Sequence, residues 1–310
     1  MSDGMQPRRA SLIAIVGATA TGKTRRAVDV ARATGGEIIS ADSRQVYRRM
    51  DIGTGKDLEE YGEIAVHLVD VCEPGEKYNL HRFLRDYRES LADIRGRGAL
   101  PVVCGGSGMY VEAALNGLKL PEVPRNDSLR QELGDKSLAE LTGILAGMKS
   151  LHNTTDVDTV DRALRAIEIQ HYYMQHPGEE YGSKSDPEKD ALIIGIEIDR
   201  EMRRKRIDDR LMARFRSGMT EEVERLLAEG VPSENLIYYG LEYKWLTLYV
   251  IGQITREEME TGLRTAIHQF AKRQMTWFRG MERRGHTINW LPWDMDRDEF
   301  VETVKELGGL

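Results

Sequence analysis

One short stretch constrains the fold of this chain more than any other feature: Gly17, Ala18, Thr19, Ala20, Thr21, Gly22, Lys23 and Thr24. An apolar run over residues 11–16 precedes it and a helical pattern over residues 23–33 follows it. Strand, glycine-rich turn and helix in this order form a P-loop, whose backbone N–H groups surround a phosphate at a helix N-terminus. Lys23 would add a positive charge and Thr24 a hydroxyl ligand for Mg²⁺. We therefore expect residues 17–24 to bind a diphosphate or a triphosphate.

Short apolar runs recur along the chain, at residues 37–40, 65–71, 100–104 and 191–198. Most are separated by segments long enough for a helix, and two long helical patterns follow, over residues 201–229 and residues 256–284. This alternation predicts an α/β fold with a mainly parallel sheet flanked by helices, because near-continuous apolar strands are typical of sheets buried on both faces.

The character of the chain changes over residues 119–189. The segment is polar, has helical patches at residues 137–150 and 160–173, and closes in a loop-like stretch rich in glycine, proline and charge. We expect a smaller helical insertion here, within a P-loop core formed by residues 1–118 and 190–310.

Composition narrows the classes of function. The net charge of -7 argues against a protein that coats nucleic acid indiscriminately, although cations gather at residues 200–216 and 272–284. Cys72 and Cys104 lie in or beside apolar stretches and are predicted to be buried thiols rather than a disulfide or a zinc site. The sequence has no apolar run of about 18 residues and no signal-peptide core at its start, so we expect a cytoplasmic protein without a membrane partner.

Two further loops carry polar groups at the ends of expected strands. Asp42 follows the run at residues 37–40, and parallel sheets bind ligands at this edge, although an aspartate here could also cap a helix. A second glycine-rich loop, residues 105–108 with Ser107 within it, follows the run at residues 100–104. It is either a tight turn or a set of N–H and hydroxyl donors for the oxygens of a leaving group.

Five motifs, in this order, resemble those of the tRNA dimethylallyltransferase family: GATATGKT, ADSRQVYRRMDIGTGK, GGSGMY, RALRAIE and AKRQMTWFRG. The resemblance implies an enzyme that moves a dimethylallyl group from dimethylallyl diphosphate to the N6 amine of the adenosine adjacent to the anticodon in tRNA. Asp42 matches the base that accepts the proton of this amine. By the same resemblance Lys23, Ser107, Arg210 and a Mg²⁺ at Thr24 stabilise the departing diphosphate.

The resemblance also implies contacts with the anticodon stem-loop of tRNA, from Asp42, Ser43, Arg44, Gln45, Arg162 and Arg165. Two positions depart from the family pattern. Asp161 stands where a glutamine is usual, and a carboxylate near an RNA backbone repels rather than donates. Ser107 replaces a threonine but retains the hydroxyl.

Three other functions stay open at this point. A related prenyltransferase would use AMP, ADP or ATP as acceptor, but the RALRAIE insertion and the basic C-terminal helices suit an RNA better. A P-loop kinase or NTPase would consume ATP, with Asp70 holding Mg²⁺ after the run at residues 65–71. An inactive RNA-binding protein would not need Lys23, Thr24 and Asp42, all of which are present. No protein partner is implied.

Overall fold

The computed structural model describes residues 9–120, 122–151, 155–177 and 187–310. The chain divides into two compact units. The large unit comprises Met1–Gly117 and Asp186–Leu310, and the small unit comprises Leu118–Ser185. The expected absence of a signal peptide concerns a stretch that lies mostly outside the described residues.

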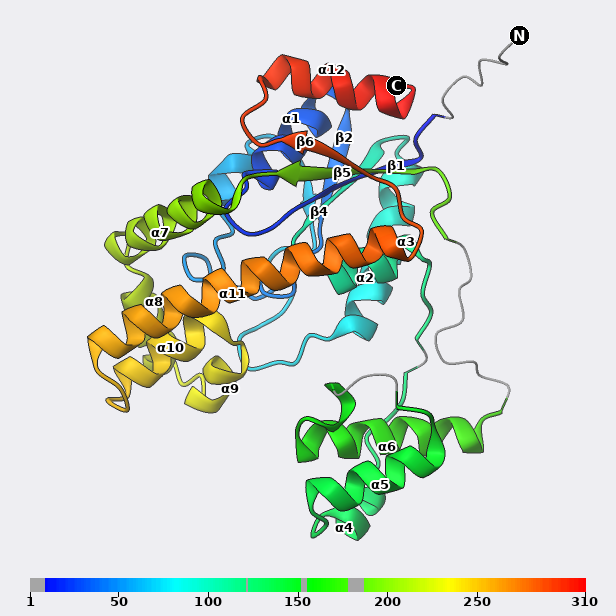
Figure 1. The fold of residues 1–310 in the computed structure, drawn as a ribbon, viewed down its shortest axis with the longest axis vertical. Coiled ribbons are helices and arrows are strands. Elements are labelled where there is room, and N and C mark those ends of the chain that lie inside the picture. The colour runs from blue at the N-terminus through cyan, green and yellow to red at the C-terminus, as the bar shows by residue number, and fades with distance from the viewer. Residues whose placement is uncertain (1–8, 121, 152–154, 178–186) are drawn as a thin grey trace. The chain divides into compact units, whose positions relative to one another are not determined.

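A parallel sheet of six strands forms the centre of the large unit, in the order β3-β2-β4-β1-β5-β6 (Figure 1). Its strands are β1 Leu12–Val16, β2 Gly36–Ser40, β3 Val66–His67, β4 Leu100–Gly105, β5 Ala191–Glu197 and β6 Ile288–Pro292. β1 is buried along its whole length, as the apolar composition of the run requires. The predicted α/β fold with a parallel sheet is confirmed.

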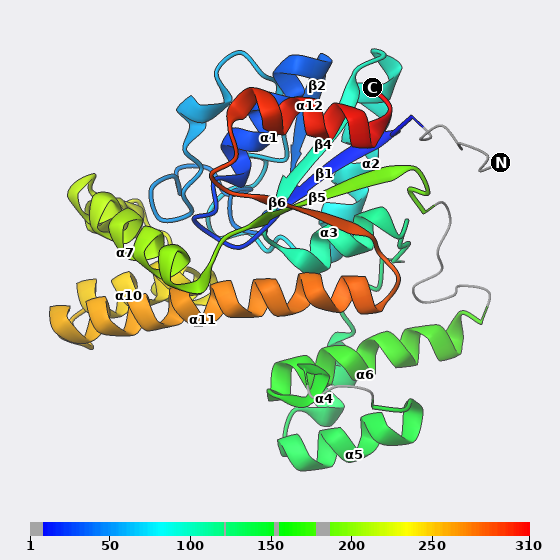
Figure 2. The ribbon, with the colours of Figure 1, turned by 45° about the horizontal axis from the view of Figure 1, so that its top comes forward.

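Helices cover both faces of this sheet (Figures 1 and 2). The described helices of the large unit are α1 Lys23–Thr34, α2 Leu80–Gly96, α3 Gly108–Leu115, α7 Arg200–Arg216, α8 Met219–Ala228, α9 Ser233–Tyr238, α10 Leu241–Val250, α11 Arg256–Arg283 and α12 Arg297–Gly308, with the 3-10 helix η1 Leu58–Tyr61. On one face, Ile13 and Ile15 of β1 pack in one cluster with Ala27 of α1 and Phe300 of α12. α2 and α3 lie on the other face, and α11 contacts α3, α7 and α10.

Three elements differ from the sequence-based expectations. The helix predicted over residues 201–229 is interrupted between α7 and α8, where Gly218 has a left-handed φ of 92°. The strand predicted at residues 65–71 is only two residues long, because Leu68 (φ 63°) and Asp70 (φ 55°) leave the extended conformation. β6, which pairs with β5, was not predicted.

The small unit is helical. It contains α4 Asp127–Leu133, α5 Leu138–Met148, the 3-10 helix η2 Thr155–Val157 and α6 Val160–Gln175. Ser137 and Glu140 form a capping box at the start of α5, and Thr159 caps α6. Leu141 and Leu145 of α5 pack with Ile167 of α6 in a core of its own. Part of the predicted closing loop, residues 178–186, lies outside the described residues.

The described part of the chain contains neither a disulfide nor a helix that could span a membrane. Cys72 and Cys104 are both buried and free, which confirms their prediction as small buried thiols. Among the helices described, none has the length and apolar character needed to cross a bilayer.

Candidate active site

Residues 17–24 connect β1 to α1 in a tight turn with two left-handed residues, Ala20 (φ 63°) and Gly22 (φ 84°). No side chain caps α1 at Gly22. The first N–H groups of a helix lack intrahelical partners and carry the positive end of its dipole. This end of α1 is therefore suited to bind a phosphate group.

Lys23 lies at this turn with a weak contact, since its Nζ is 3.5 Å from the Ala18 carbonyl oxygen. In the part of the chain that the structure describes, it forms no ion pair. Burial lowers the pKa of Lys23, and although the charge of Asp42 opposes this effect, that of Arg210 adds to it. A bound anion would stabilise the protonated amine.

Two arginines of α7 line a cavity together with residues of this turn. Arg206 donates from Nε to the Ala20 carbonyl at 2.8 Å. Arg210 donates to the Gly55 carbonyl at 3.4 Å and forms an ion pair with the carboxylate of Asp57. α7 thus places fixed positive charge opposite the start of α1, where the charge of a departing diphosphate would be stabilised.

Asp42 begins a turn that follows β2, and its Oδ1 accepts a hydrogen bond of 2.8 Å from the backbone N–H of Arg44. No helix starts there, so the interpretation of Asp42 as a helix cap is wrong. The Ser107 Oγ accepts a hydrogen bond of 3.2 Å from the N–H of Ser43. The second glycine-rich loop is thereby joined to the Asp42 turn.

Two cavities meet at the P-loop. The first has a volume of about 420 Å³ and the second about 380 Å³. The first is lined by Asp42, Ser43, Arg44, Gln45 and Ser107 among others, the second by Ala20, Gly22 and Arg206 among others. Both are lined by Lys23, Thr24 and Arg210. Two molecules can therefore approach the same three side chains from different sides.

Two family models match the chain, "IPP transferase" over residues 45–281 and "Isopentenyl transferase" over residues 10–64. A protein named tRNA dimethylallyltransferase 2 from Bacteroides fragilis is 56% identical over 299 residues, which cover 95% of this chain and 97% of the relative. This chain belongs to the tRNA dimethylallyltransferase family. A tRNA dimethylallyltransferase 1 from Porphyromonas gingivalis is also 56% identical, over 96% of this chain and 98% of the relative.

Solved structures agree with membership of the tRNA dimethylallyltransferase family. A tRNA isopentenylpyrophosphate transferase from Bacillus halodurans is 29% identical with a TM-score of 0.70, over 96% of this chain and 95% of that one. A eukaryotic dimethylallyltransferase, crystallised acting on tRNA, has a TM-score of 0.74 over 91% of this chain and 73% of that one. At 21% identity, this second likeness supports the fold.

Gln274, in the family motif on α11, has a structural function that the sequence did not predict. The buried amide of Gln274 accepts a hydrogen bond of 2.8 Å from the P-loop N–H of Thr19 and donates one of 2.9 Å to the Gly106 carbonyl. A Cβ atom on Gly106 would lie only 2.3 Å from the Gln274 Nε2, so a side chain there would displace this amide. Gln274 therefore links the two glycine-rich loops.

Glu222 of α8 is another residue that the sequence did not single out. Its carboxylate accepts backbone hydrogen bonds from Asp51 at 2.8 Å, from Ile52 at 2.9 Å and from Gly53 at 3.0 Å. It also accepts a hydrogen bond of 2.6 Å from the hydroxyl of Tyr243, and it is only 3% exposed. Gly53 and Tyr243 line the first cavity, so Glu222 fixes part of its wall. Glu222 is one of three glutamates in α8, and the sequence gives no signal that sets it apart from the other two.

Asp70 is one of the partners of Lys56, whose amine is fully buried. Lys56 Nζ donates to the Tyr47 carbonyl and to the Asp51 carboxylate, both at 2.6 Å, and it forms an ion pair with Asp70. Asp70 lines neither cavity at the P-loop. Its carboxylate neutralises a buried cation, so the kinase interpretation of Asp70 as a magnesium ligand loses its support.

The amide of Gln45 is engaged within the large unit. It accepts a hydrogen bond of 3.1 Å from Ser40 and donates one of 3.1 Å to the Gly55 carbonyl, although Gln45 also lines the first cavity. Gln45 therefore holds the loop at residues 53–55 beside the Asp42 turn.

The small unit holds the remaining residues that the resemblance had singled out. Arg162 of α6 is exposed and forms an ion pair with Asp158, which precedes that helix. Arg165 donates to the Val123 carbonyl at 2.7 Å and to Glu168 at 3.1 Å, so part of its guanidinium stabilises the unit itself. Asp161 forms an ion pair of 2.8 Å with Arg130. This pairing reduces the repulsion that an isolated carboxylate would exert on RNA.

The donor set of the site fits a magnesium ion bound mainly through phosphate. Thr24 lines both cavities, and the second is also lined by Asp57, Glu60 and Asp209. No group of three or more acidic, histidine or cysteine side chains among the described residues forms a ready-made metal centre. Mg²⁺ takes one or two protein ligands and completes its shell with water and substrate phosphate.

Proposed function

We propose that this chain transfers a dimethylallyl group from dimethylallyl diphosphate to the N6 amine of the adenosine adjacent to the anticodon in tRNA, and releases diphosphate. The observation that carries the proposal is the pair of cavities that share Lys23, Thr24 and Arg210. The cavity lined by Asp42 would admit the acceptor, and the cavity at the end of the P-loop would admit the diphosphate donor. A transfer reaction requires that these two molecules meet. Membership of the family supports this assignment.

The P-loop holds the donor's diphosphate as a leaving group. Its N–H groups, Lys23 and Arg210 surround the oxygens, and the Ser107 hydroxyl adds a further donor from the second glycine-rich loop. The negative charge on the diphosphate grows as its bond to the first prenyl carbon breaks, and fixed positive groups stabilise that state more than the ground state. The residues proposed to bind the diphosphate are Gly17, Ala18, Thr19, Ala20, Thr21, Gly22, Lys23 and Thr24.

Asp42 serves as the general base. The exocyclic nitrogen of the target adenosine forms a bond to the first carbon of the prenyl donor, and the bonding pair of the carbon–oxygen bond leaves with the diphosphate. Asp42 accepts the proton that the nitrogen loses. The N–H of Arg44, donated to Asp42 Oδ1 at 2.8 Å, fixes the direction of the carboxylate and leaves its second oxygen for this proton.

Mg²⁺ is part of the proposal. Thr24 would hold it through the hydroxyl, and the carboxylates around the second cavity would bind its water ligands. When bound, the ion neutralises charge on the diphosphate.

The tRNA contacts of the proposal lie in both units. Asp42, Ser43, Arg44 and Gln45 would contact the anticodon loop beside the base, and Arg162 and Arg165 the phosphates of its stem. The target base must leave its stack to reach Asp42. With tRNA as its substrate, the enzyme is proposed to act in the cytoplasm.

The test is transfer of label from radiolabelled dimethylallyl diphosphate, with Mg²⁺, to unmodified tRNA and in parallel to AMP, ADP and ATP. The proposal predicts label in tRNA alone. Label in a free nucleotide would assign the chain to nucleotide prenylation instead. Label in none of them, together with ATP consumption, would contradict the proposal and favour a kinase or NTPase.

A further inference from the structure

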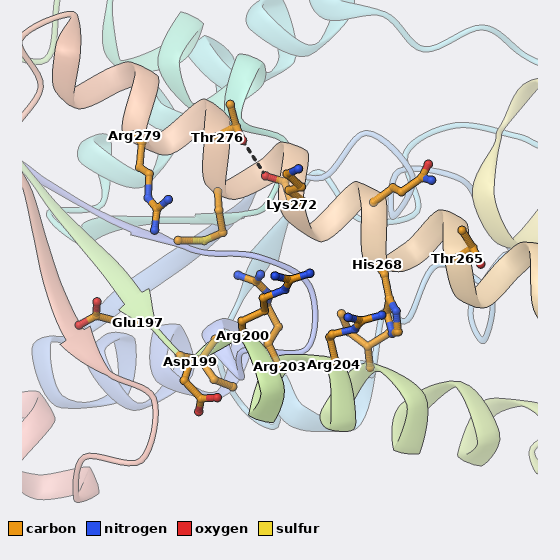
Figure 3. A pocket seen from close by; sticks show the side chains of 14 residues that line it. Glu197, Asp199, Arg200, Arg203, Arg204, Thr265, His268, Lys272, Thr276 and Arg279 are labelled. Atoms are coloured by element: carbon orange, nitrogen blue, oxygen red, sulfur yellow. Dashed lines mark hydrogen bonds between the residues drawn. The ribbon is translucent and has the colours of Figure 1, made fainter.

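A third cavity, of about 650 Å³, lies between α7 and α11 (Figure 3). We call it the α7–α11 groove. Its lining includes five permanent cations: Arg200, Arg203, Arg204, Lys272 and Arg279. Figure 3 shows Arg279 extending from α11 toward Arg200 and Arg203, which extend from α7 into the same space. Like charges face each other across the groove, which costs free energy unless an anion lies between them.

The cations of the groove differ from most arginines of this protein, which pair with carboxylates. Within the described ranges, none of the five forms an ion pair or donates a side-chain hydrogen bond. Glu197 and Asp199 also line the groove, but the Asp199 carboxylate accepts the N–H groups of Glu201 and Met202, both at 2.9 Å, and caps α7. The groove is thus lined by five cations and only two carboxylates, so its lining keeps an excess of positive charge.

Arg203 gives the second observation. Its Nε is buried and has no hydrogen-bond partner among the described residues. Burial and the neighbouring charges of Arg279 and Arg200 lower the pKa of Arg203. A buried donor without an acceptor is unfavourable, and an oxyanion in the groove would supply the acceptor.

The lining indicates which anion fits. Four arginines present planar forks of N–H donors, the geometry that binds phosphate oxygens in pairs. No phenylalanine, tyrosine or tryptophan is among the described residues that line the groove, so it offers little surface on which a base could stack. The groove is therefore suited to phosphates of a chain rather than to a complete nucleotide.

The groove lies one helix away from the first cavity. α11 lines the groove with Lys272, Thr276 and Arg279 and lines the first cavity with Arg273 and Gln274. An RNA strand whose base enters the first cavity continues from that cavity in both directions. α11 therefore connects the two surfaces that such a strand would follow.

From these observations we infer that the α7–α11 groove binds phosphates of the tRNA backbone, with the arginines of α7 forming one wall of the site. This inference rests on the proposed function. It adds a phosphate-binding site outside the cavities that hold the reacting groups.

The test compares Arg203→Gln with wild-type protein by measuring the dissociation constant of unmodified tRNA over a range of salt concentrations. We expect the dissociation constant to rise about tenfold at low salt, since a charge-assisted hydrogen bond contributes about 1.5–3 kcal/mol. The slope of log affinity against log salt should become shallower by about 0.7–0.9 for each phosphate that the variant no longer neutralises. Saturating tRNA should restore kcat, and the KM for dimethylallyl diphosphate should not change.

Two variants control for charge and folding. Arg256→Gln removes one exposed positive charge at the other end of α11 and should leave tRNA affinity within about twofold of wild type. Arg203→Lys retains the charge and should recover part of the salt slope. Equal thermal unfolding of all proteins would show that Arg203→Gln folds normally. If Arg203→Gln does not fold normally, the tRNA dissociation constant of Arg279→Gln, in the opposite wall of the groove, tests the inference instead.

The possible results separate this inference from the proposed function. If wild-type protein prenylates tRNA while Arg203→Gln and Arg279→Gln bind tRNA like wild type, the groove inference is wrong and the proposed function stands. If wild-type protein does not prenylate tRNA, the proposed function itself fails. Inorganic tripolyphosphate serves as a separate probe, because binding that depends on Arg203 without any change in tRNA affinity would assign the groove to a free polyphosphate and overturn the inference.

Discussion

Replacing Glu222 by alanine removes the acceptor that holds the loop at residues 51–53 against α8. The carboxylate accepts three backbone N–H groups and the hydroxyl of Tyr243. Burial, together with the charge of Glu222, raises the pKa of Tyr243, so the phenol remains a donor. In the alanine variant all four donors lose their partner at once.

The magnitude follows from the exposure of these donors. The Gly53 N–H and the Tyr243 hydroxyl are in buried hydrogen bonds, whereas those from Asp51 and Ile52 are partly exposed and can turn to water. A buried donor left without a partner costs about 1–3 kcal/mol, and removal of a buried charged partner costs about 3–5 kcal/mol. We expect Glu222→Ala to lower the free energy of unfolding by about 3–5 kcal/mol, which in a unit of this size lowers Tm by roughly 10 °C.

Activity should change selectively, because the loop lines the cavity of Asp42. The KM for tRNA should rise, while the affinity for dimethylallyl diphosphate should change little. Calorimetry and steady-state kinetics of Glu222→Ala test this, with Glu224→Ala as the control because Glu224 is exposed on the same helix. Glu222→Gln retains one oxygen acceptor, so its Tm and its KM for tRNA should lie between those of Glu222→Ala and Glu224→Ala. A Tm within about 2 °C of wild type together with an unchanged KM for tRNA would refute the reasoning.

Three further predictions concern the reacting groups. Asp42→Asn should reduce single-turnover transfer about 10²–10⁴-fold and leave the tRNA dissociation constant nearly unchanged; undiminished transfer would exclude Asp42 as the base. Because the pKa of Lys23 is lowered, its positive charge is lost at a lower pH than that of an ordinary lysine, so the KM for the prenyl diphosphate should rise with pH. Lys23→Arg should flatten this profile, and a profile unaffected by the substitution would assign the pH dependence elsewhere. Gln274→Leu should weaken binding of the prenyl diphosphate about tenfold by releasing Thr19 and Gly106, as measured by calorimetric titration; unchanged affinity would show that the link between the loops is dispensable.

The sequence predicted the parallel sheet because its signals are local. Apolar runs, the turn at residues 17–24 and the helix after it each depend on neighbouring residues. The sequence did not predict the shortness of β3, since the left-handed conformation of Leu68 is imposed by surroundings that no local pattern reveals. The sequence does not predict the interruption at Gly218, because a single glycine is also compatible with a continuous helix.

The site shows the same division. Motifs indicated Lys23, at the end of the loop after β1, and Asp42 and Ser107, which follow β2 and β4 within two residues, so all three lie at one edge of the sheet. Gln274 lies 255 residues from its partner Thr19, and Glu222 lies 169 residues from Gly53. Such contacts depend on how distant helices pack, and no local pattern in the sequence reveals that packing.

The central claim is tested most directly by locating the prenyl group in the product. Unmodified tRNA is incubated with wild-type protein, Mg²⁺ and dimethylallyl diphosphate, then digested to nucleosides and fragments for mass spectrometry. The account predicts one dimethylallyl group on the N6 amine of the adenosine adjacent to the anticodon, and none with Asp42→Asn over the same time. A prenyl group on another nucleoside, or an unmodified tRNA, would contradict it.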